Sequence, residues 1–367
     1  MSKEKKNQAS QSIIFLVDDN GYYAHKIAFF DDQGSIQTLK YNSIIGTDQE
    51  AQNDLTGGLT NMYETDDGQR FVCNQHILNP ITIRSGDYGT TTENRVLVNH
   101  GLVKAGMAGK TLHLATALPM RDYYSRTGNA NGALIAGQAA NMQRTVYQAF
   151  SQDREQQPVA NISSSRVYPE GISALYDLLL DDKGIETCGL DDLAAPIAIL
   201  DFGGSTYDVA AVSPELNILQ DASGTLKRGT IDIAEAFSEM ALSYLRDDLG
   251  FSISKIPGWM VNMAFEEGCI RTHNKGELKT VDVRPLLEKA ATPVVQEIKK
   301  FTISKLNDLS GYQFLLLVGG GALLCRSLFA DWEDQYGLII RDEFANARGM
   351  LKRLAFVDFA DSAPNAA

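Results

Sequence analysis

The sequence lacks the long apolar segments of a membrane protein. No apolar run approaches the roughly 18 residues that a membrane helix needs, and the longest is about the length of Phe314–Val318. The first ten residues are polar and charged, which predicts neither a secretion signal nor a membrane anchor. Cysteines are few and form no CxxC pair, so we expect reduced, mostly buried thiols: Cys73, Cys188, Cys269 and Cys325. These features together predict a cytoplasmic protein with no membrane contact.

Positive charge is also scarce. Lys and Arg number 33 against 46 Asp and Glu, which gives a formal charge of −13. A broad grip on a phosphate backbone would need a concentrated basic surface, and no run of basic residues interleaved with aromatics occurs. We therefore expect no tight direct binding to DNA. Hydrophobic residues make up 44% and charged residues 22% of 367 positions, which is typical of a globular protein of two domains, or at most three.

Short apolar runs and turn signals indicate an α/β organisation. Ile13–Val17, Ala24–Phe30 and Ser35–Leu39 predict a three-stranded meander, and Ile197–Leu200 begins a similar one whose third strand we expect at Leu216–Asp221. The other strands predicted are Leu112–Leu118, Ile162–Tyr168 and Phe314–Val318. Helices are predicted after an N-cap at Thr92, from near Pro169, and at about 230–248, 257–270, 284–307 and 343–356. Residues 46–68 are expected to form an irregular excursion, and the pattern of 128–160 assigns no structure.

An internal repeat is the most informative feature of the chain. Sliding the sequence by 182 residues places Asp19 on Asp201 and Gly21 on Gly203. Both halves then run in the order apolar strand, Asp-x-Gly turn, apolar strand, turn, strand. Two matching hairpins could arise by chance. A strand-end aspartate followed two residues later by a glycine in both hairpins is much less expected by chance. The spacing predicts duplicated domains that face one another.

The turn residues suit phosphate and a divalent cation. Glycine lets backbone N–H groups approach phosphate oxygens, and an aspartate at a strand end can hold Mg²⁺, usually through water. Gly203-Gly204-Ser205-Thr206 adds two hydroxyls, and Gly319-Gly320-Gly321 follows a strand and opens a helix. Glu170 stands where a strand gives way to a helix, a position from which a carboxylate could orient water. Each feature alone also fits an ordinary hairpin, a close packing turn or an exposed first-turn acid.

Other chemistries find little support. Gly109-Lys110-Thr111 resembles the end of a Walker A loop, but Lys104 occupies the place of the first glycine and a strand follows. Cys269 and His273 lie four residues apart without a second ligand pair, so zinc is not expected. The sequence has no Gly-x-Ser-x-Gly elbow and no GxGxxG after a strand.

With these residues in view, the chain resembles the superfamily of actin, Hsp70 and the sugar kinases, and within it the ParM/StbA-type plasmid-segregation proteins. Asp19-Asn20-Gly21 with Lys26 is similar to the first phosphate loop, and Leu200–Val209 to the second. Val318–Ala322 is similar to the adenosine loop, and Tyr168-Pro169-Glu170 to the first connecting segment. Ala117–Tyr124, Ser310–Tyr312 and the stretch from Arg341 to Met350 are similar to segments of the ParM/StbA group.

The resemblance implies an α/β fold of duplicated actin-like (ribonuclease H-like) domains that flank a nucleotide cleft. Domain I would span residues 12–165, with 335–356 returning to it, and domain II would span 166–334. Asp19 and Asp201 would organise Mg²⁺ and the attacking water, and Glu170 would position that water. The remaining residues would bind ATP, with GTP left open: Asn20, Gly21, Tyr22, Lys26, Gly203, Gly204, Ser205, Thr206, Gly319, Gly320, Gly321 and Ala322. Residues that select the base are expected within 225–275.

The function implied is an ATP-dependent, dynamically unstable filament that segregates plasmid DNA. Such a filament would reach DNA through a DNA-bound adaptor protein (ParR-like). One departure is that Tyr22 and Tyr23 stand where relatives often carry Ser or Thr, which removes a hydroxyl contact from the first loop. A small-molecule kinase of the same superfamily is the alternative, and a chaperone-like switch is disfavoured because no substrate domain is expected after residue 356.

Overall fold

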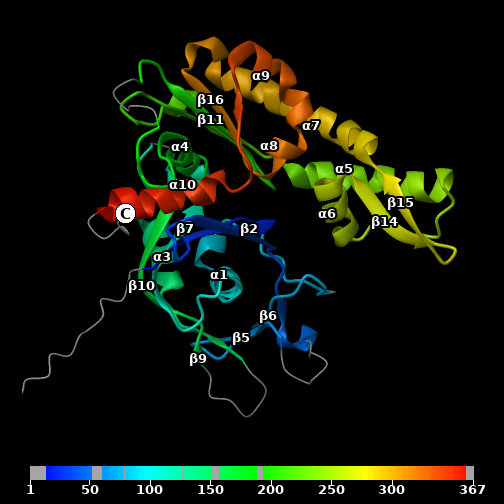
Figure 1. Ribbon diagram of the computed structural model, residues 1–367, viewed down its shortest axis with the longest axis horizontal. Coiled ribbons are helices and arrows are strands. Elements are labelled where there is room, and N and C mark those ends of the chain that lie inside the picture. Colours follow the sequence, from blue (N-terminus) through cyan, green and yellow to red (C-terminus); the bar gives the residue numbers. More distant parts are fainter. Residues whose placement is uncertain are drawn as a thin grey trace, which may run out of the picture.

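The computed structural model describes residues 14–51, 60–77, 79–125, 128–149, 157–187 and 193–360. Its framework is a pair of five-stranded sheets with the same strand order (Figure 1). The first sheet runs β3–β2–β1–β7–β10, with these bounds: β1 Ile14–Asn20, β2 Ala24–Phe30, β3 Ile36–Asn42, β7 Thr111–Leu118 and β10 Asn161–Pro169. The second runs β13–β12–β11–β16–β17: β11 Ile197–Phe202, β12 Tyr207–Val212, β13 Gly224–Leu226, β16 Phe314–Val318 and β17 Ile339–Ile340.

Strand directions repeat as well as strand order. In each sheet the first three strands form an antiparallel meander, and the first strand then pairs in parallel with a later one. The duplication predicted from the 182-residue offset is therefore confirmed, together with the α/β class. The central strand β11 is buried at every position because both faces of its sheet are covered.

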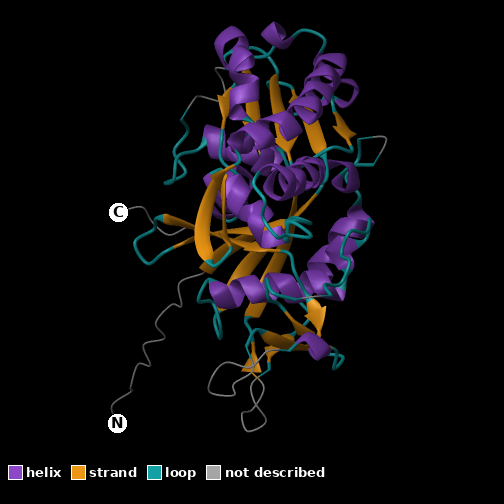
Figure 2. Cartoon of the chain, turned by 90° about the vertical axis from the view of Figure 1, so that its right-hand side faces the viewer, coloured by secondary structure: helices purple, strands orange, loops and turns teal. Residues whose placement is uncertain are grey.

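Helices cover both faces of each sheet. On the first sheet, α1 (Thr92–Lys104) and α3 (Gly132–Met142) lie on one face and α10 (Ala345–Arg353) on the other. On the second, α4 (Ile172–Leu179) lies on one face, while the opposite face carries α5 (Thr230–Ser243), α6 (Gly258–Glu267), α7 (Arg284–Leu306), α8 (Gly320–Leu324) and α9 (Ala330–Tyr336). α4 and α10 pack on each other and form a helical layer between the two sheets (Figure 1). Figure 2 shows helices between the two groups of strands.

Smaller elements are added to this framework. A third sheet, β4–β6–β5–β8–β9, consists of β4 Gly46–Thr47, β6 Arg70–Val72, β5 Met62–Thr65, β8 Val146–Gln148 and β9 Gln157–Pro158. We call the first sheet with its helices and the third sheet the first body, and the second sheet with its helices the second body. A two-stranded ribbon of β14 (Cys269–Asn274) and β15 (Glu277–Asp282) extends from the second body beside α6. We call α6, β14 and β15 the arm; it stands out to the right in Figure 1. The short helix α2 (Met120–Tyr123) follows β7.

Several local predictions were wrong, and backbone geometry explains them. The helix expected from 257 to 270 ends at Glu267, because Gly268 takes a left-handed conformation with φ +70°, and β14 follows. The helix expected near Pro169 begins only at Ile172, after Gly171 at φ +71°. The strand expected at Leu216–Asp221 is replaced by a turn with Leu216 at φ +62°, and the third strand is β13.

Smaller corrections concern caps and excursions. The N-cap of α1 is Thr91 rather than Thr92, and its side chain accepts a hydrogen bond from the Asn94 amide. The excursion at 46–68 contains β4 and β5, and the stretch 128–160 contains α3, β8 and β9. The described cysteines Cys73, Cys269 and Cys325 are free thiols, while Cys188 and the polar N-terminus lie outside the described residues. None of the helices in the described part of the chain combines the length and hydrophobicity needed to cross a membrane.

Candidate nucleotide site

A cavity of about 430 Å³ lies where the repeated hairpins of the two sheets meet. That volume is in the range of pockets that hold small molecules. Of the residues predicted from the sequence, most line it: Asp19, Gly21, Tyr22, Lys26, Glu170, Asp201, Gly203, Gly204, Ser205, Thr206, Gly319 and Gly320. Asn20, Gly321 and Ala322 do not line this cavity. The two halves of the repeat thus contribute to one site.

The first loop places an acid and a base side by side. Asp19 pairs with Lys26 across β1 and β2, and the Lys26 ammonium donates to the Asp19 carboxylate at 3.1 Å. The Gly21 amide donates to the Asp19 carbonyl, and a Cβ on Gly21 would stand 2.9 Å from the Ala24 carbonyl oxygen. A side chain at Gly21 would therefore disturb the turn. Burial opposes the charge of Lys26, but Asp19 outweighs it, with help from Asp201 and Glu170, so the pKa of Lys26 is raised.

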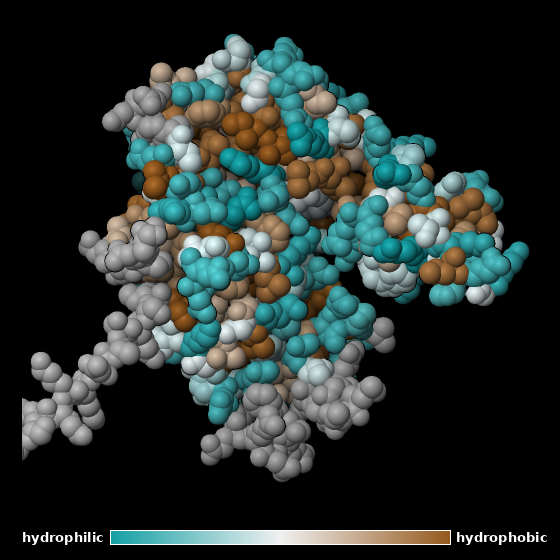
Figure 3. All heavy atoms as spheres, in the orientation of Figure 1, coloured by the Kyte–Doolittle hydropathy of each residue, from teal (hydrophilic) through white to brown (hydrophobic). Residues whose placement is uncertain are grey.

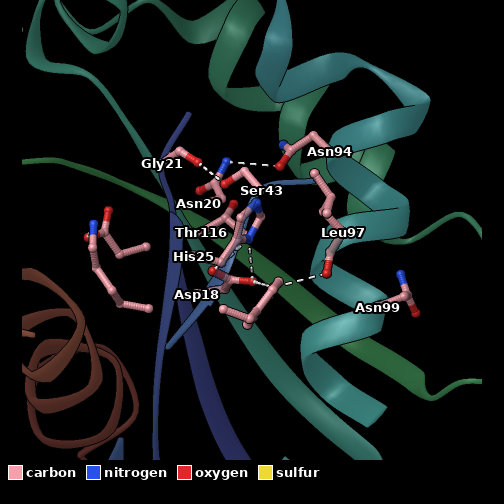
Figure 4. A network of polar contacts seen from close by, with 12 residues as sticks. Asp18, Asn20, Gly21, His25, Ser43, Asn94, Leu97, Asn99 and Thr116 are labelled. Atoms are coloured by element: carbon pink, nitrogen blue, oxygen red, sulfur yellow. Dashed lines mark hydrogen bonds and ion pairs between the residues drawn. The ribbon is translucent and has the colours of Figure 1, made fainter. Parts of the chain in front are cut away.

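Behind this loop, Asn20 and Asp18 point away from the cavity into a buried polar network (Figure 4). The Asn20 amide group donates to Asn94 and accepts from the Ala117 backbone amide, at 3.2 and 2.8 Å. The Asp18 carboxylate meets the His25 ring nitrogen Nδ1 at 2.9 Å. Asn20 thus connects the first loop to α1 and β7, which is a structural role. The sequence pattern did not distinguish this role from contact with a ligand.

The second loop is held from three sides. The Gly203 amide donates to the Thr206 carbonyl at 2.9 Å, and the Thr206 hydroxyl donates to Asp208 at 2.9 Å. The first amides of α5 donate to the carbonyls of Gly203 and Gly204. These bonds fix the loop, and all four of its residues, Gly203 to Thr206, line the cavity.

The third loop, Gly319-Gly320-Gly321, brings α8 against β11. Gly319 has φ +91°, and a Cβ there would lie 2.5 Å from the Phe202 carbonyl oxygen and 2.6 Å from the Asp201 carboxylate. A Cβ on Gly321 would lie 2.4 Å from the Phe202 ring. Gly319 and Gly320 therefore line the cavity, whereas Gly321 and Ala322 are buried and permit close packing of α8.

Three carboxylates dominate the charge of the site. Burial raises the pKa of Asp201 to about 7; the charges of Asp19 and Asp208 add to this, while a hydrogen bond from Asn346 opposes it. Burial, followed by the charges of Asp19 and Asp201, raises the pKa of Glu170 well above its usual range. The amide nitrogen of Asn346 donates a hydrogen bond to the Asp201 carboxylate at 2.8 Å. Over the whole cavity lining, carboxyl groups outnumber basic side chains: Asp19, Glu170, Asp201, Glu266 and Glu343 against Lys26, Lys40 and Arg121.

This excess of carboxylate fits a divalent cation bound together with phosphate. Among the described residues, no cluster of three or more His, Cys, Asp and Glu side chains is arranged to hold a metal by itself. Mg²⁺, however, commonly uses only one or two carboxylates and keeps several waters beside substrate phosphates. Asp19 and Asp201 are suited to that mode, in keeping with the expectation of a contact through water.

Several cavity residues were not assigned from the sequence. They come from distant parts of the chain: Tyr23, Ala24, Lys40, Pro119, Arg121, Thr230, Phe265, Glu266, Leu323, Leu324, Glu343 and Asn346. Thr230, Phe265 and Glu266 fall within 225–275, where base selection was expected. Asn346 lies in a segment whose likeness to the ParM/StbA group was noted without a role. Its side chain also accepts from the Gly171 amide at 3.0 Å, so it links Asp201 to the residue after Glu170.

Comparisons with known proteins agree with this fold. Residues 13–181 match the family model of the N-terminal part of the plasmid segregation protein ParM, and residues 199–331 match that of the C-terminal part of archaeal MreB-like actin homologues. Together with the duplicated fold, these matches define the class: the chain belongs to the actin-like superfamily. Within that class it stands close to ParM.

Solved structures share the fold at low identity. An archaeal actin homologue superposes with TM-score 0.68 at 19% identity, over 93% of this chain and 98% of that one, and it has also been solved with ADP. A Bacillus thuringiensis ParM with ATP gives 0.61 at 14%, over 93% and 98%. A ParM from a 15-stranded Clostridium botulinum filament gives 0.60 at 16%, over 93% and 98%. No curated protein sequence matches the chain.

Proposed function

We propose that this protein binds ATP with Mg²⁺ in the cavity, hydrolyses it, and forms dynamically unstable filaments that segregate plasmid DNA. The observation that carries the proposal is the gathering of two Asp-x-Gly loops, Lys26 and Glu170 around one cavity of about 430 Å³. In this proposal the two lobes keep the expected bounds, residues 12–165 with 335–356 and residues 166–334, except at two places: β17 (Ile339–Ile340) belongs to the second sheet, and β10 stays in the first sheet as far as Pro169. The relatives solved with ADP and ATP support nucleotide binding, and GTP as a second substrate stays open.

Each cavity residue has a chemical part in this proposal. Lys26 would contact the β- and γ-phosphates as a point charge, and the backbone amides of the two hairpin loops would cradle their oxygens. Mg²⁺, held by Asp19 and Asp201 through water, would supply neutralisation of phosphate charge. Glu170 would hold the attacking water and accept its proton, and a raised pKa makes its carboxylate a stronger base. Phe265 and Leu323 offer apolar surface to a base.

Self-association is supported by the ParM relative seen as a filament and by the surface of the arm. Large apolar side chains there are exposed, with Trp259 at 50% and Leu278 at 62%. Figure 3 shows the arm as a projection with both hydrophilic and hydrophobic areas. Residues of this kind are available for contact between subunits. ATP would favour the closed, assembling form, and hydrolysis would weaken the contacts.

Light scattering tests the proposal directly. Addition of ATP and Mg²⁺ should raise scattering, which should then decay as ATP is consumed, whereas ADP should give no lasting rise. The Glu170→Ala variant should also assemble, but its scattering should decay more slowly than that of wild type. A flat signal, with ATP consumed only after a hydroxyl-bearing small molecule is added, would replace the filament with a kinase.

We further propose a cytoplasmic protein that reaches DNA through a DNA-bound, ParR-like adaptor. The net charge of −13 opposes the counterion release that drives non-specific DNA binding. In a gel-shift assay at physiological salt, the purified protein should barely retard plasmid DNA, with or without ATP. Tight, sequence-specific retardation by the protein alone would remove the adaptor from the proposal.

A further inference from the structure

A tyrosine in the first loop reaches across the cavity to the second body. Tyr23 lies between β1 and β2 of the first sheet, and its hydroxyl donates to the side-chain oxygen of Asn262 on α6. Its Cβ also stands 3.0 Å from where a Cβ on Gly204 would be, so Tyr23 packs directly on the second loop. One side chain therefore joins both phosphate-facing loops and the arm.

The helix that accepts this bond is firmly anchored on its other face. Met260, Val261 and Ala264 are buried in the core of the second body, with exposures of 4%, 7% and 0%. Phe265 lies one turn after Asn262 and lines the cavity. A bond to Asn262 therefore holds a cavity wall, rather than a loose surface segment.

The two bodies are joined a second time at the α4–α10 layer. There Gly349 lies so close to α4 that a Cβ would stand 1.8 Å from the Ser173 carbonyl oxygen. In Figure 1, α10 lies to the left and α6 to the right of the region between the sheets. Backbone packing joins the bodies at α4–α10, whereas the hydrogen bond at α6 joins two side chains and could break without a change in either backbone.

We propose that Tyr23 and Asn262 form a latch across the cavity that slows the release of bound nucleotide. This inference rests on the proposed function, since it takes the cavity ligand to be a nucleoside triphosphate. Breaking the bond leaves the loops and the buried face of α6 intact. The expected consequence is faster exchange of nucleotide, with less effect on the hydrolysis step itself.

A tyrosine outside the cavity supplies a control. The Tyr63 hydroxyl forms a hydrogen bond with the His100 ring nitrogen Nδ1 at 2.9 Å. Tyr63 lies on β5 and His100 on α1, so both partners belong to the first body. Tyr63→Phe therefore removes a hydroxyl hydrogen bond of the same kind without touching the cavity or the contact between the bodies.

The test is the dissociation of a fluorescent ATP analogue with Mg²⁺, chased with excess ATP in a stopped-flow instrument. Tyr23→Phe and Asn262→Ala should each release the analogue about 3- to 10-fold faster, the range expected for one net hydrogen bond. Tyr63→Phe should stay within about twofold of wild type, because its bond lies outside the cavity and does not span it. The double variant Tyr23→Phe/Asn262→Ala should release no faster than the faster single variant, since both remove the same contact.

Hydrogen exchange in nucleotide-free protein separates this inference from the proposed function. Tyr23→Phe should raise amide exchange in α6, and Tyr63→Phe should not. Unchanged exchange in α6, or additive release rates in the double variant, would overturn the latch whatever the cavity binds. If Tyr23→Phe raises exchange in α6 but the wild type binds no ATP analogue, the contact between Tyr23 and Asn262 is supported. Its role in nucleotide retention and the proposed function are then both overturned.

Discussion

Among the glycines that the structure describes, Gly349 in α10 has the least room for a side chain. A Cβ there would stand 1.8 Å from the carbonyl oxygen of Ser173, 2.7 Å from its carbonyl carbon and 3.1 Å from the amide nitrogen of Asp177. All three atoms belong to the backbone of α4 and cannot rotate away. Gly349→Ala would therefore force α4 and α10 apart by roughly 1 Å or more, in a layer packed to crystal-like density.

Two opposing contributions set the magnitude of the effect. Overpacking of a tight core costs about 1–3 kcal/mol, occasionally more. Alanine in a helix interior returns about 1 kcal/mol relative to glycine. Separation would also stretch the ion pairs that Asp177 of α4 makes with Arg348 and Lys352 of α10, at 2.8 and 2.9 Å. Because these are largely buried, their loss adds to the cost, and we expect a net loss of about 2 kcal/mol.

Urea and thermal unfolding followed by circular dichroism measure this loss. Gly132→Ala is the control, because Gly132 begins α3 and a Cβ there would meet nothing within 4 Å. The control should unfold with wild type, while Gly349→Ala should unfold at lower urea and lower temperature. Equal stability of the two variants would refute the reasoning that α4 and α10 are held at a distance only glycine allows.

Three further predictions concern the carboxylates. Glu170→Ala should bind nucleotide almost as wild type does and hydrolyse it about 10²–10⁴-fold more slowly; normal turnover in the assembled variant would remove Glu170 from the reaction. Asp201→Ala should damage Mg²⁺-dependent hydrolysis more than Asp208→Ala, because Asp201 lines the cavity and Asp208 does not; the reverse order would contradict the reading of the second loop. Since the folded pKa of Asp201, about 7, exceeds its ordinary 3.8, the stability linked to its proton is present at low pH and lost as pH rises to 7 and beyond. In nucleotide-free protein with EDTA, Asp201→Asn should therefore gain stability over wild type at pH 8, by at most about 4 kcal/mol, and the gain should shrink toward pH 5; a gain that grows at low pH would be the wrong sign.

How far the sequence predicts this fold is clearest at Asp18 and Asp19. Successive residues of a strand face opposite sides of the sheet, so the sequence predicts that the Asp18 and Asp19 side chains point in opposite directions. Asp19 lines the cavity and meets Lys26, whereas Asp18 is fully buried against His25 and Tyr41. The choice of Asp19 came from its spacing to Gly21 and from the repeat. The fold class and the superfamily were predicted for the same reason, because a repeated motif survives where single residues are ambiguous.

Contacts between distant parts of the chain explain what was missed. Tyr23 and Asn262 are 239 positions apart, and Asn346 meets Asp201 over 145 positions. Neither pair has a periodicity or spacing that a sequence displays. The β14–β15 ribbon was missed for a local reason: its strands are mostly exposed, so they lack the alternation of a half-buried strand. Its turn nevertheless has a signal, Lys275-Gly276, with both residues at positive φ.

The repeat also explains why one site arises from two similar halves without being symmetric. The register pairs Asp19 with Lys26 in the first hairpin and Asp201 with Asp208 in the second, and the same offset relates the two pairs. Lys26 neutralises Asp19 at 3.1 Å, whereas the hydroxyls of Thr206 and Thr225 satisfy Asp208, whose charge raises the pKa of Asp201. Two equal hairpins would offer a polyphosphate two equivalent orientations. A lysine in one hairpin and an aspartate in the other place Lys26 on one wall of the cavity and the Asp201 carboxylate on the other, so the two walls would differ for a polyphosphate bound between them.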